Sequence, residues 1–176
     1  MPCAFHAERP LFSFYSPPGC QFDVPEEDLI EVDDESWCPF HAPMAQKDGA
    51  PTEKAGWDEE RVQTFNQRVL AFIESAAQEG KPADLTGAVF PGKADFSGKQ
   101  FPAVCFYKVQ FSGGARFSEA QFSGDADFSE ARFSGGTDFR EARFSGLAYF
   151  GEAQFSGGAD FREARFSDEA WRWRAG

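Results

Sequence analysis

The chain has 176 residues, enough for one or two small domains, and its formal net charge is −12. Residues 1–84 hold 17 acidic and six basic side chains, whereas residues 85–176 hold 12 and 11, and neither half shows the basic stripe of a nucleic-acid-binding protein. The sequence has no apolar run of about eighteen residues to span a membrane and no secretory signal at its start, so we expect a cytoplasmic protein that binds neither nucleic acid nor membrane.

The first segment, residues 1–45, is rich in proline and acidic residues, and we expect it to be irregular. Its dense acidic run, residues 26–35, is typical of a solvated, mobile loop. The segment also holds three of the four cysteines and both histidines of the chain. In a reducing compartment, this favours metal binding or burial of the thiols over a disulfide framework.

A short module, C-x-F-H-A, occurs twice in this segment, as Cys3 with His6 and as Cys38 with His41. Two thiolates and two imidazoles form a standard tetrahedral Zn²⁺ site, and Cys20 is a fifth candidate ligand. Because the segment has few aliphatic residues for a core, a bound metal would supply the missing folding energy, so we predict a structural zinc module over residues 1–45. The alternative is a small core of reduced thiols with both histidines facing solvent.

The next two segments are a polar linker, residues 46–56, and an amphipathic helix, residues 57–80. Asp58 is a suitable N-cap, and Gly80 followed by Pro82 ends the helix. We expect the apolar stripe to cover the first coil of the repeat region, with partner binding as the alternative. The stripe consists of Val62, Phe65, Val69, Phe72, Ile73 and Ala76.

Residues 85–168 contain a phenylalanine every five or six residues, and after Phe111 the two spacings alternate, so the repeating unit has eleven residues, as in FSGDADFSEAR and FSGGTDFREAR. A fixed period of this kind predicts a solenoid, and the spacing fits no amphipathic helix. From Phe117 onward, a small residue, alanine or threonine, lies two positions before each phenylalanine. This predicts short extended stretches in which these two residues face inward and the residue between them faces outward.

The five-residue units ADFSE (residues 126–130) and ADFRE (residues 159–163) show that the repeat resembles the pentapeptide-repeat family, whose unit is A-(D/N)-(L/F)-(S/T)-x. The resemblance covers about half of the chain. It implies an all-β solenoid, a right-handed quadrilateral β-helix with the central phenylalanine stacked inside. Here every second unit has one extra residue, usually beside a glycine, which gives about 22 residues per coil and fewer than four coils. We interpret the insertion as added room for a phenylalanine interior.

Coils that stack at about 4.8 Å place equivalent residues in columns along the axis. The expected inner columns are Phe117–Phe139–Phe161, Phe122–Phe144–Phe166, Phe111–Phe133–Phe155 and Phe128–Phe150. The expected outer columns are Arg116–Asp138–Asp160 and Gln121–Arg143–Arg165.

The sequence WCPFHAP, residues 37–43, is similar to the C-x-(F/L)-H-(D/A)-P ending of small zinc-binding segments that precede pentapeptide repeats in some bacterial proteins. This second resemblance implies the ligands Cys3, Cys20, Cys38 and His41. The residues alone leave the fourth ligand open between His6 and Cys20. Cys105, next to a core phenylalanine, is predicted to be inert packing.

The sequence contains no phosphate loop, nucleophile elbow or metalloprotease motif, so we expect no enzyme. We expect a rigid scaffold that binds a protein of unknown identity and is stabilised on its N-terminal side by structural Zn²⁺. Residues 169–176, with Trp171 and Trp173, are expected to cap the last coil or to form a homodimer through that end. The alternative function, implied by the family alone, is a DNA mimic that binds DNA gyrase or topoisomerase and confers quinolone resistance. The nearly neutral repeat region disfavours it.

Overall fold

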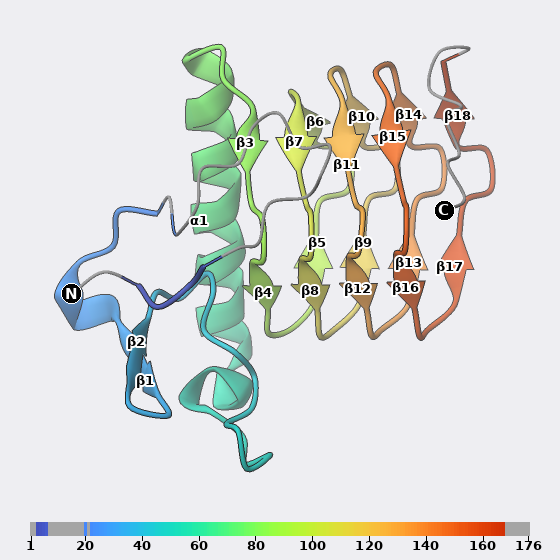
Figure 1. The fold of residues 1–176 in the computed structure, drawn as a ribbon. Helices are drawn as coiled ribbons and strands as arrows, with labels where there is room; N and C mark the ends of the chain where they lie inside the picture. The colour runs from blue at the N-terminus through green and yellow to red at the C-terminus, as the bar shows by residue number, and fades with distance from the viewer. Residues whose placement is uncertain (1–2, 7–19, 21, 168–176) are drawn as a thin grey trace.

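The computed structural model describes residues 3–6, 20 and 22–167. It consists of a small N-terminal module, one α-helix and a four-sided β-solenoid. Figure 1 shows the helix α1 standing against the first coil, while β17 and β18 lie at the opposite end of the solenoid. Among the described residues, no helix has the length and hydrophobicity needed to cross a membrane.

The acidic run near the N-terminus is folded. It contains the 3₁₀ turn η1 (Glu26–Asp28) and the antiparallel hairpin of β1 (Ile30–Val32) and β2 (Glu35–Trp37). Two aspartates form the hairpin turn with φ angles of 52° and 64°, as a tight two-residue turn requires. The interpretation of residues 26–35 as a solvated, mobile loop is therefore wrong. The charge of this run suggests a solvated loop, but Ile30 and Val32 alternate with Glu31 along β1 and bury one face of the strand.

The predicted linker also contains structure. Ala45 and Pro51 form an isolated antiparallel bridge, and the 3₁₀ turn η2 (Glu53–Gly56) follows. Lys54, in η2, is fully buried. The polar composition of residues 46–56 did not indicate this burial.

The helix α1 (Glu59–Gln78) matches the prediction closely. The Asp58 side chain accepts a hydrogen bond from the Arg61 backbone N–H at 2.9 Å and so caps the helix. Phe65 lies edge-on to Phe90 of the first coil, with ring centroids 5.3 Å apart, and Val62 lies against Gly92. The apolar stripe therefore covers the N-terminal end of the solenoid, which confirms the capping interpretation.

Four parallel four-stranded sheets form the sides of the solenoid. The first contains β3 (Ala83–Asp84), β7 (Val104–Cys105), β11 (Ala126–Asp127) and β15 (Ala148–Tyr149). The second contains β4 (Val89–Phe90), β8 (Gln110–Phe111), β12 (Arg132–Phe133) and β16 (Gln154–Phe155). The third contains β5 (Ala94–Asp95), β9 (Ala115–Arg116), β13 (Thr137–Asp138) and β17 (Ala159–Asp160). The fourth contains β6 (Gln100–Phe101), β10 (Gln121–Phe122), β14 (Arg143–Phe144) and β18 (Arg165–Phe166).

Strand register gives the length of each coil. Ala83 pairs with Val104, 21 positions later, and Ala126 pairs with Ala148, 22 positions later. On the other three sides, the separation between paired residues also increases from 21 to 22 positions after the first coil. The predicted coil of about 22 residues is confirmed, and the first coil is one residue shorter.

The phenylalanines fill the interior as predicted. Rings within a column lie with centroids 4.6–5.2 Å apart, for example Phe122 over Phe144 and Phe128 over Phe150. Rings of neighbouring columns meet edge to face, as Phe128 meets Phe139 at 5.5 Å. Both are favourable aromatic geometries. All four predicted columns are present, and each extends one coil towards α1.

Glycines at one corner position allow the coils to stack this closely. A Cβ atom on Gly135 would lie 2.7 Å from the backbone of Gly113 in the coil below, and a Cβ on Gly157 would lie 2.5 Å from the Gly135 carbonyl oxygen. The second glycine of each pair is different, because a Cβ on Gly136 would meet no atom closer than 4.0 Å. The sequence showed the glycine pairs, but only the structure shows that the first member is required for backbone approach.

Candidate metal centre

One turn of backbone brings Cys38 and His41 together directly after β2. The His41 and Ala42 backbone N–H groups both donate to the Cys38 carbonyl, at 3.1 and 2.9 Å. This turn places the Cys38 sulfur 3.2 Å from the Nδ1 atom of His41. The second C-x-F-H module, Cys38 with His41, therefore forms a compact turn that presents two candidate ligands.

Two further thiols reach this turn from distant parts of the chain. The Ala4 N–H donates to the Ser36 carbonyl at 2.8 Å, and the Cys38 N–H donates to the Cys3 sulfur at 3.2 Å, so Cys3 lies beside the end of β2. The sulfur atoms of Cys20 and Cys38 are 3.5 Å apart. All four ligand atoms lie within 4.8 Å of one another.

This donor set fits a tetrahedral metal site. Zn²⁺–sulfur bonds of about 2.3 Å place tetrahedral sulfur ligands about 3.8 Å apart. The Cys3 sulfur lies 3.9 Å from His41 Nδ1, the Cys20 and Cys38 sulfurs lie 3.5 Å apart, and no pair of ligand atoms is more than 4.8 Å apart. Three thiols and one imidazole within this range are close enough to bind one ion.

The other ring nitrogen of His41 contacts the solenoid. His41 Nε2 lies 3.0 Å from the Thr86 carbonyl oxygen in the first coil. Donation from Nε2 to this carbonyl leaves the lone pair on Nδ1, which faces the thiols. On one side the imidazole stacks on Phe5, with centroids 3.7 Å apart. The tautomer and the orientation of this ligand are thus set by residues outside the cluster.

Gly87 makes room for the Phe5 ring. Its φ angle is +72°, and a Cβ atom there would lie only 2.3 Å from the ring of Phe5. Gly87 follows Thr86, the residue that contacts His41. The first coil is therefore shaped to receive the N-terminal module.

The three thiols share protons through mutual hydrogen bonds. Hydrogen bonds from Cys20 and Cys38 lower the pKa of Cys3, while the hydrogen bond with Cys3 raises the pKa of Cys20 to about 11. The pKa of Cys38 is raised by its hydrogen bonds to Cys20 and Cys3 and by burial. Without a metal, the cluster therefore favours one thiolate at Cys3, and a dication would have to displace protons from the other two.

The remaining sequence candidates lie elsewhere. His6 is exposed and is not part of the group of four, so the structure brings Cys20 rather than His6 to the other three residues. Cys105 is buried in β7, where its sulfur lies 3.3 Å from Thr86 Oγ1 and burial raises the pKa of its thiol to about 12. This environment is that of a packed, unreactive cysteine.

A family profile described as pentapeptide repeats (9 copies) matches residues 85–143 and 139–175. This chain is a member of the pentapeptide-repeat family. Comparison with curated proteins and with solved structures found no match for the chain. The candidate metal centre of this pentapeptide-repeat protein lies before the matched residues, but His41 and Phe5 join it to the first coil.

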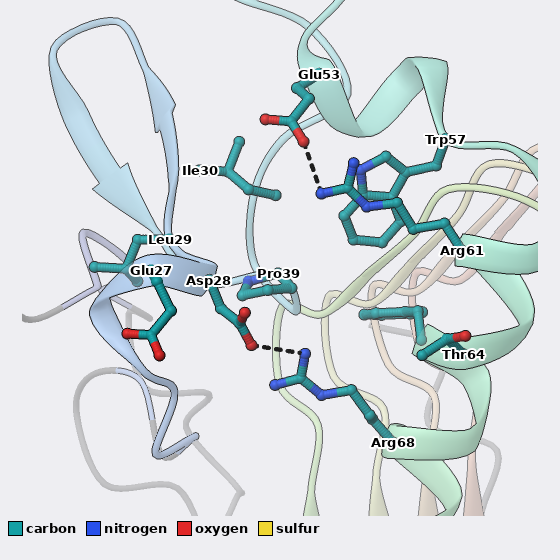
Figure 2. Close-up of a pocket in the computed structure, with 11 residues that line it drawn as sticks. Glu27, Asp28, Leu29, Ile30, Pro39, Glu53, Trp57, Arg61, Thr64 and Arg68 are labelled. Carbon is teal, nitrogen blue, oxygen red and sulfur yellow. Dashed lines mark hydrogen bonds and ion pairs between the residues drawn. The ribbon is translucent and has the colours of Figure 1, made fainter.

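A cleft of about 240 Å³ separates the N-terminal module of this pentapeptide-repeat protein from α1. Figure 2 shows Arg61 pointing to Glu53 and Arg68 pointing to Asp28 across the cleft. These ion pairs measure 2.7 and 3.1 Å and are partly exposed, so each contributes about 1 kcal/mol or less. Both arginines are already paired, and their ion pairs connect α1 to η2 and to η1 across the cleft.

The outer columns of the solenoid carry mixed charges. The register aligns Asp95, Arg116, Asp138 and Asp160 on one side, and Gln121, Arg143 and Arg165 on another, as predicted. Arg140 reaches both Asp138 at 2.7 Å and Asp160 at 3.7 Å. The solenoid therefore presents a regular surface of mixed charges over a filled interior.

Proposed function

We propose that this pentapeptide-repeat protein is a non-enzymatic scaffold that presents the faces of its solenoid to a protein partner. We also propose that structural Zn²⁺, held by Cys3, Cys20, Cys38 and His41, fastens the N-terminal module to the first coil. The observation that carries the metal proposal is the double contact of His41, whose Nδ1 faces the thiols and whose Nε2 contacts the Thr86 carbonyl. A metal on this imidazole would link the module directly to the solenoid.

The choice of Zn²⁺ rests on the donor set. Three sulfur ligands and one imidazole suit a tetrahedral, soft-ligand site, whereas Mg²⁺ and Ca²⁺ need oxygen ligands. The four residues supply a full tetrahedral set, which is typical of structural sites rather than catalytic ones. The bound ion would replace the large apolar core that the module lacks.

The scaffold proposal rests on the filled interior and the repeated exterior. Phenylalanines from Phe90 to Phe144 are almost completely buried, so the solenoid axis offers no space for a substrate. Equivalent outer side chains recur at the strand spacing on each face, which suits recognition of an extended partner surface. In a pull-down from native cells, reversing the charge of Arg116 and Arg140 should abolish recovery of the partner, whereas reversing Arg132 on a different side serves as the matched control. Equal recovery with all variants would contradict a role for the charged face.

The metal proposal is tested by elemental analysis of protein purified without added metal. We expect about one zinc per chain, as a single four-ligand site requires. Replacement of Cys38 by serine should remove the metal, whereas replacement of Cys105 by serine should leave it in place. A wild-type protein without any transition metal would overturn the proposal.

Hydrogen exchange tests what the metal does. After chelation, amides of residues 30–42 and of the first coil near Thr86 should exchange faster, while amides of β12 and β13 should keep their protection. Uniform protection with and without metal would show that the ion does not fasten the module.

The DNA-mimic alternative is not favoured by the outer surface, because one described outer column contains Arg116 among aspartates and another contains Arg143 and Arg165 without any acidic residue. A mimic of duplex DNA needs a continuous acidic surface. A supercoiling assay with purified gyrase separates the two functions. Inhibition at low protein concentration would favour the mimic.

The predicted cap at residues 169–176 lies outside the described residues. Phe155 and Phe161, in the last coil, are only partly buried. We propose a homodimer through this end, which would cover these rings. Light scattering should give twice the chain mass, and replacing Trp171 and Trp173 by alanine should halve it. A wild type with the mass of one chain would exclude the dimer.

A further inference from the structure

Lys54 is the most unusual buried side chain among the described residues. It is fully buried in η2, and none of the described aspartates or glutamates forms an ion pair with its ammonium group. A lysine is almost never buried this completely without a charged partner, because desolvation of an ammonium group is costly. Its retention inside the protein therefore requires a compensating interaction.

The Lys54 contacts lead to the metal centre. Its Nζ donates to the Pro39 carbonyl and, at 3.4 Å, to the Phe40 carbonyl. It also lies over the rings of Phe65 and Trp57, at 4.9 and 5.6 Å from their centroids. Pro39 and Phe40 are the two residues between the ligands Cys38 and His41, so the ammonium group holds the carbonyls of the ligand turn.

The charge of the proposed centre explains why a cation is needed there. Three thiolates and one neutral imidazole around a dication carry a net charge of −1, which is costly to bury without a counter-charge. Burial lowers the pKa of Lys54 to about 7, and negative charge at the neighbouring Cys38 and Cys3 sulfurs acts in the opposite direction and favours the charged form. Lys54 is thus in the electrostatic field of the cluster.

We propose that Lys54 is a positioning and charge-balancing residue of the metal centre. Its ammonium group compensates the negative charge of the three-thiolate site and fixes the Cys38–His41 turn through two backbone carbonyls. This inference rests on the proposed zinc function and assigns to it a residue that is not a ligand. It also accounts for the burial of a charged side chain within a polar segment.

The test is a competition between the full-length protein and a chromophoric chelator for Zn²⁺. Lys54→Gln keeps a hydrogen-bond donor without the charge, Lys54→Met keeps the apolar stem, and Lys54→Arg keeps the charge. Loss of a partner outside the ligand set commonly weakens metal binding by about 10–100-fold, which is the effect we expect for both neutral variants. Lys54→Arg should bind the metal more tightly than either. Lys47→Gln, which removes an exposed lysine of the same segment, residues 46–56, should bind Zn²⁺ like the wild type.

A second readout separates lost charge from lost ligands. With Co²⁺ in place of zinc, the absorption spectra of the neutral variants should keep the pattern of the wild type, because all four ligands remain. Affinity equal to the wild type in Lys54→Gln or Lys54→Met would overturn the inference alone. If Lys54→Arg weakens metal binding as much as the neutral variants do, Lys54 acts through packing rather than charge, and the inference is also overturned. A wild type that binds no metal would instead overturn the proposed function on which the inference rests.

Discussion

The N-terminal module and the solenoid achieve order in different ways. In the module, four residues from separated positions in the sequence meet at one point, and none of them belongs to a repeat: Cys3, Cys20, Cys38 and His41. The solenoid repeats one local solution, in which every inner phenylalanine of the middle coils stacks on equivalents above and below. The module should therefore fail when one residue is lost, whereas the solenoid should lose stability in steps.

Their junction combines the two strategies. The first coil has no coil below it, and α1 supplies Val62, Phe65, Val69 and Ile73 as a cover. The module then attaches through His41 and Phe5 to Thr86 and Gly87. A solenoid needs terminal caps because its end exposes apolar rings and backbone groups, and here the N-terminal module provides part of that cap.

The largest expected effect is at Cys38. Cys38→Ser removes a ligand and leaves the ion with an incomplete set, so the free energy of metal binding, which is about 10–16 kcal/mol in small zinc modules, is largely lost. We expect the module to unfold while the circular dichroism of the solenoid persists. Cys105→Ser is the matched control. Simultaneous unfolding of both regions would show that they are one cooperative unit.

The fourth ligand gives a similar comparison within the module. Cys20→Ser should weaken metal binding strongly, because the Cys20 sulfur lies in the cluster, whereas His6→Ala should leave affinity unchanged, because His6 is exposed. Chelator competition measures both. The reverse order would mean that His6 replaces Cys20 when the metal is bound.

The core of the solenoid provides the next effect. Phe117→Ala should lower the free energy of unfolding by about 3–5 kcal/mol, because the ring is fully buried between two others. Phe161→Ala, at the end of the same column, should cost less because that ring is only partly buried. Denaturant midpoints compare the two variants. Equal losses would indicate that the last coil is covered as fully as the middle ones.

Two adjacent glycines, Gly135 and Gly136, allow a sharper comparison of stability within the solenoid. Gly135→Ala should destabilise the solenoid by about 1–3 kcal/mol, because its Cβ would overlap the backbone of Gly113. Gly136→Ala should be neutral or slightly stabilising, since its Cβ meets open space and alanine restricts the unfolded chain. Thermal unfolding distinguishes them. Destabilisation by both would mean that coil stacking tolerates no added atoms at either position.

The smallest expected effect concerns Asp127, on β11. Burial raises the pKa of its carboxyl group, so the ionised form is disfavoured in the folded protein. The stability from the protonated form is complete below the unfolded pKa and is lost as pH rises through the folded pKa. Asp127→Asn should therefore raise the unfolding midpoint slightly at neutral pH and lose this advantage in acid. Its amide oxygen can still accept the Ser129 N–H bond. A lower midpoint at neutral pH would contradict this account.

The sequence by itself determined the solenoid, its inner columns and the helix that covers it. These features depend on local patterns, because each five- or six-residue unit places its own phenylalanine inside and stacking repeats the result. The short motif also brought Cys38 and His41 together, since their spacing closes a single turn. The charge of residues 26–35 concealed the alternation of Ile30 and Val32, so the hairpin was missed.

Only the tertiary structure decided which residues complete the candidate metal centre and how it joins the solenoid. The choice of Cys20 over His6, the contact of His41 with Thr86 and the burial of Lys54 all join residues far apart in sequence. No local periodicity encodes such contacts, because each occurs once and depends on the path of the whole chain. A repeat can be predicted from its period, whereas a site assembled from single residues becomes visible only after folding brings them together.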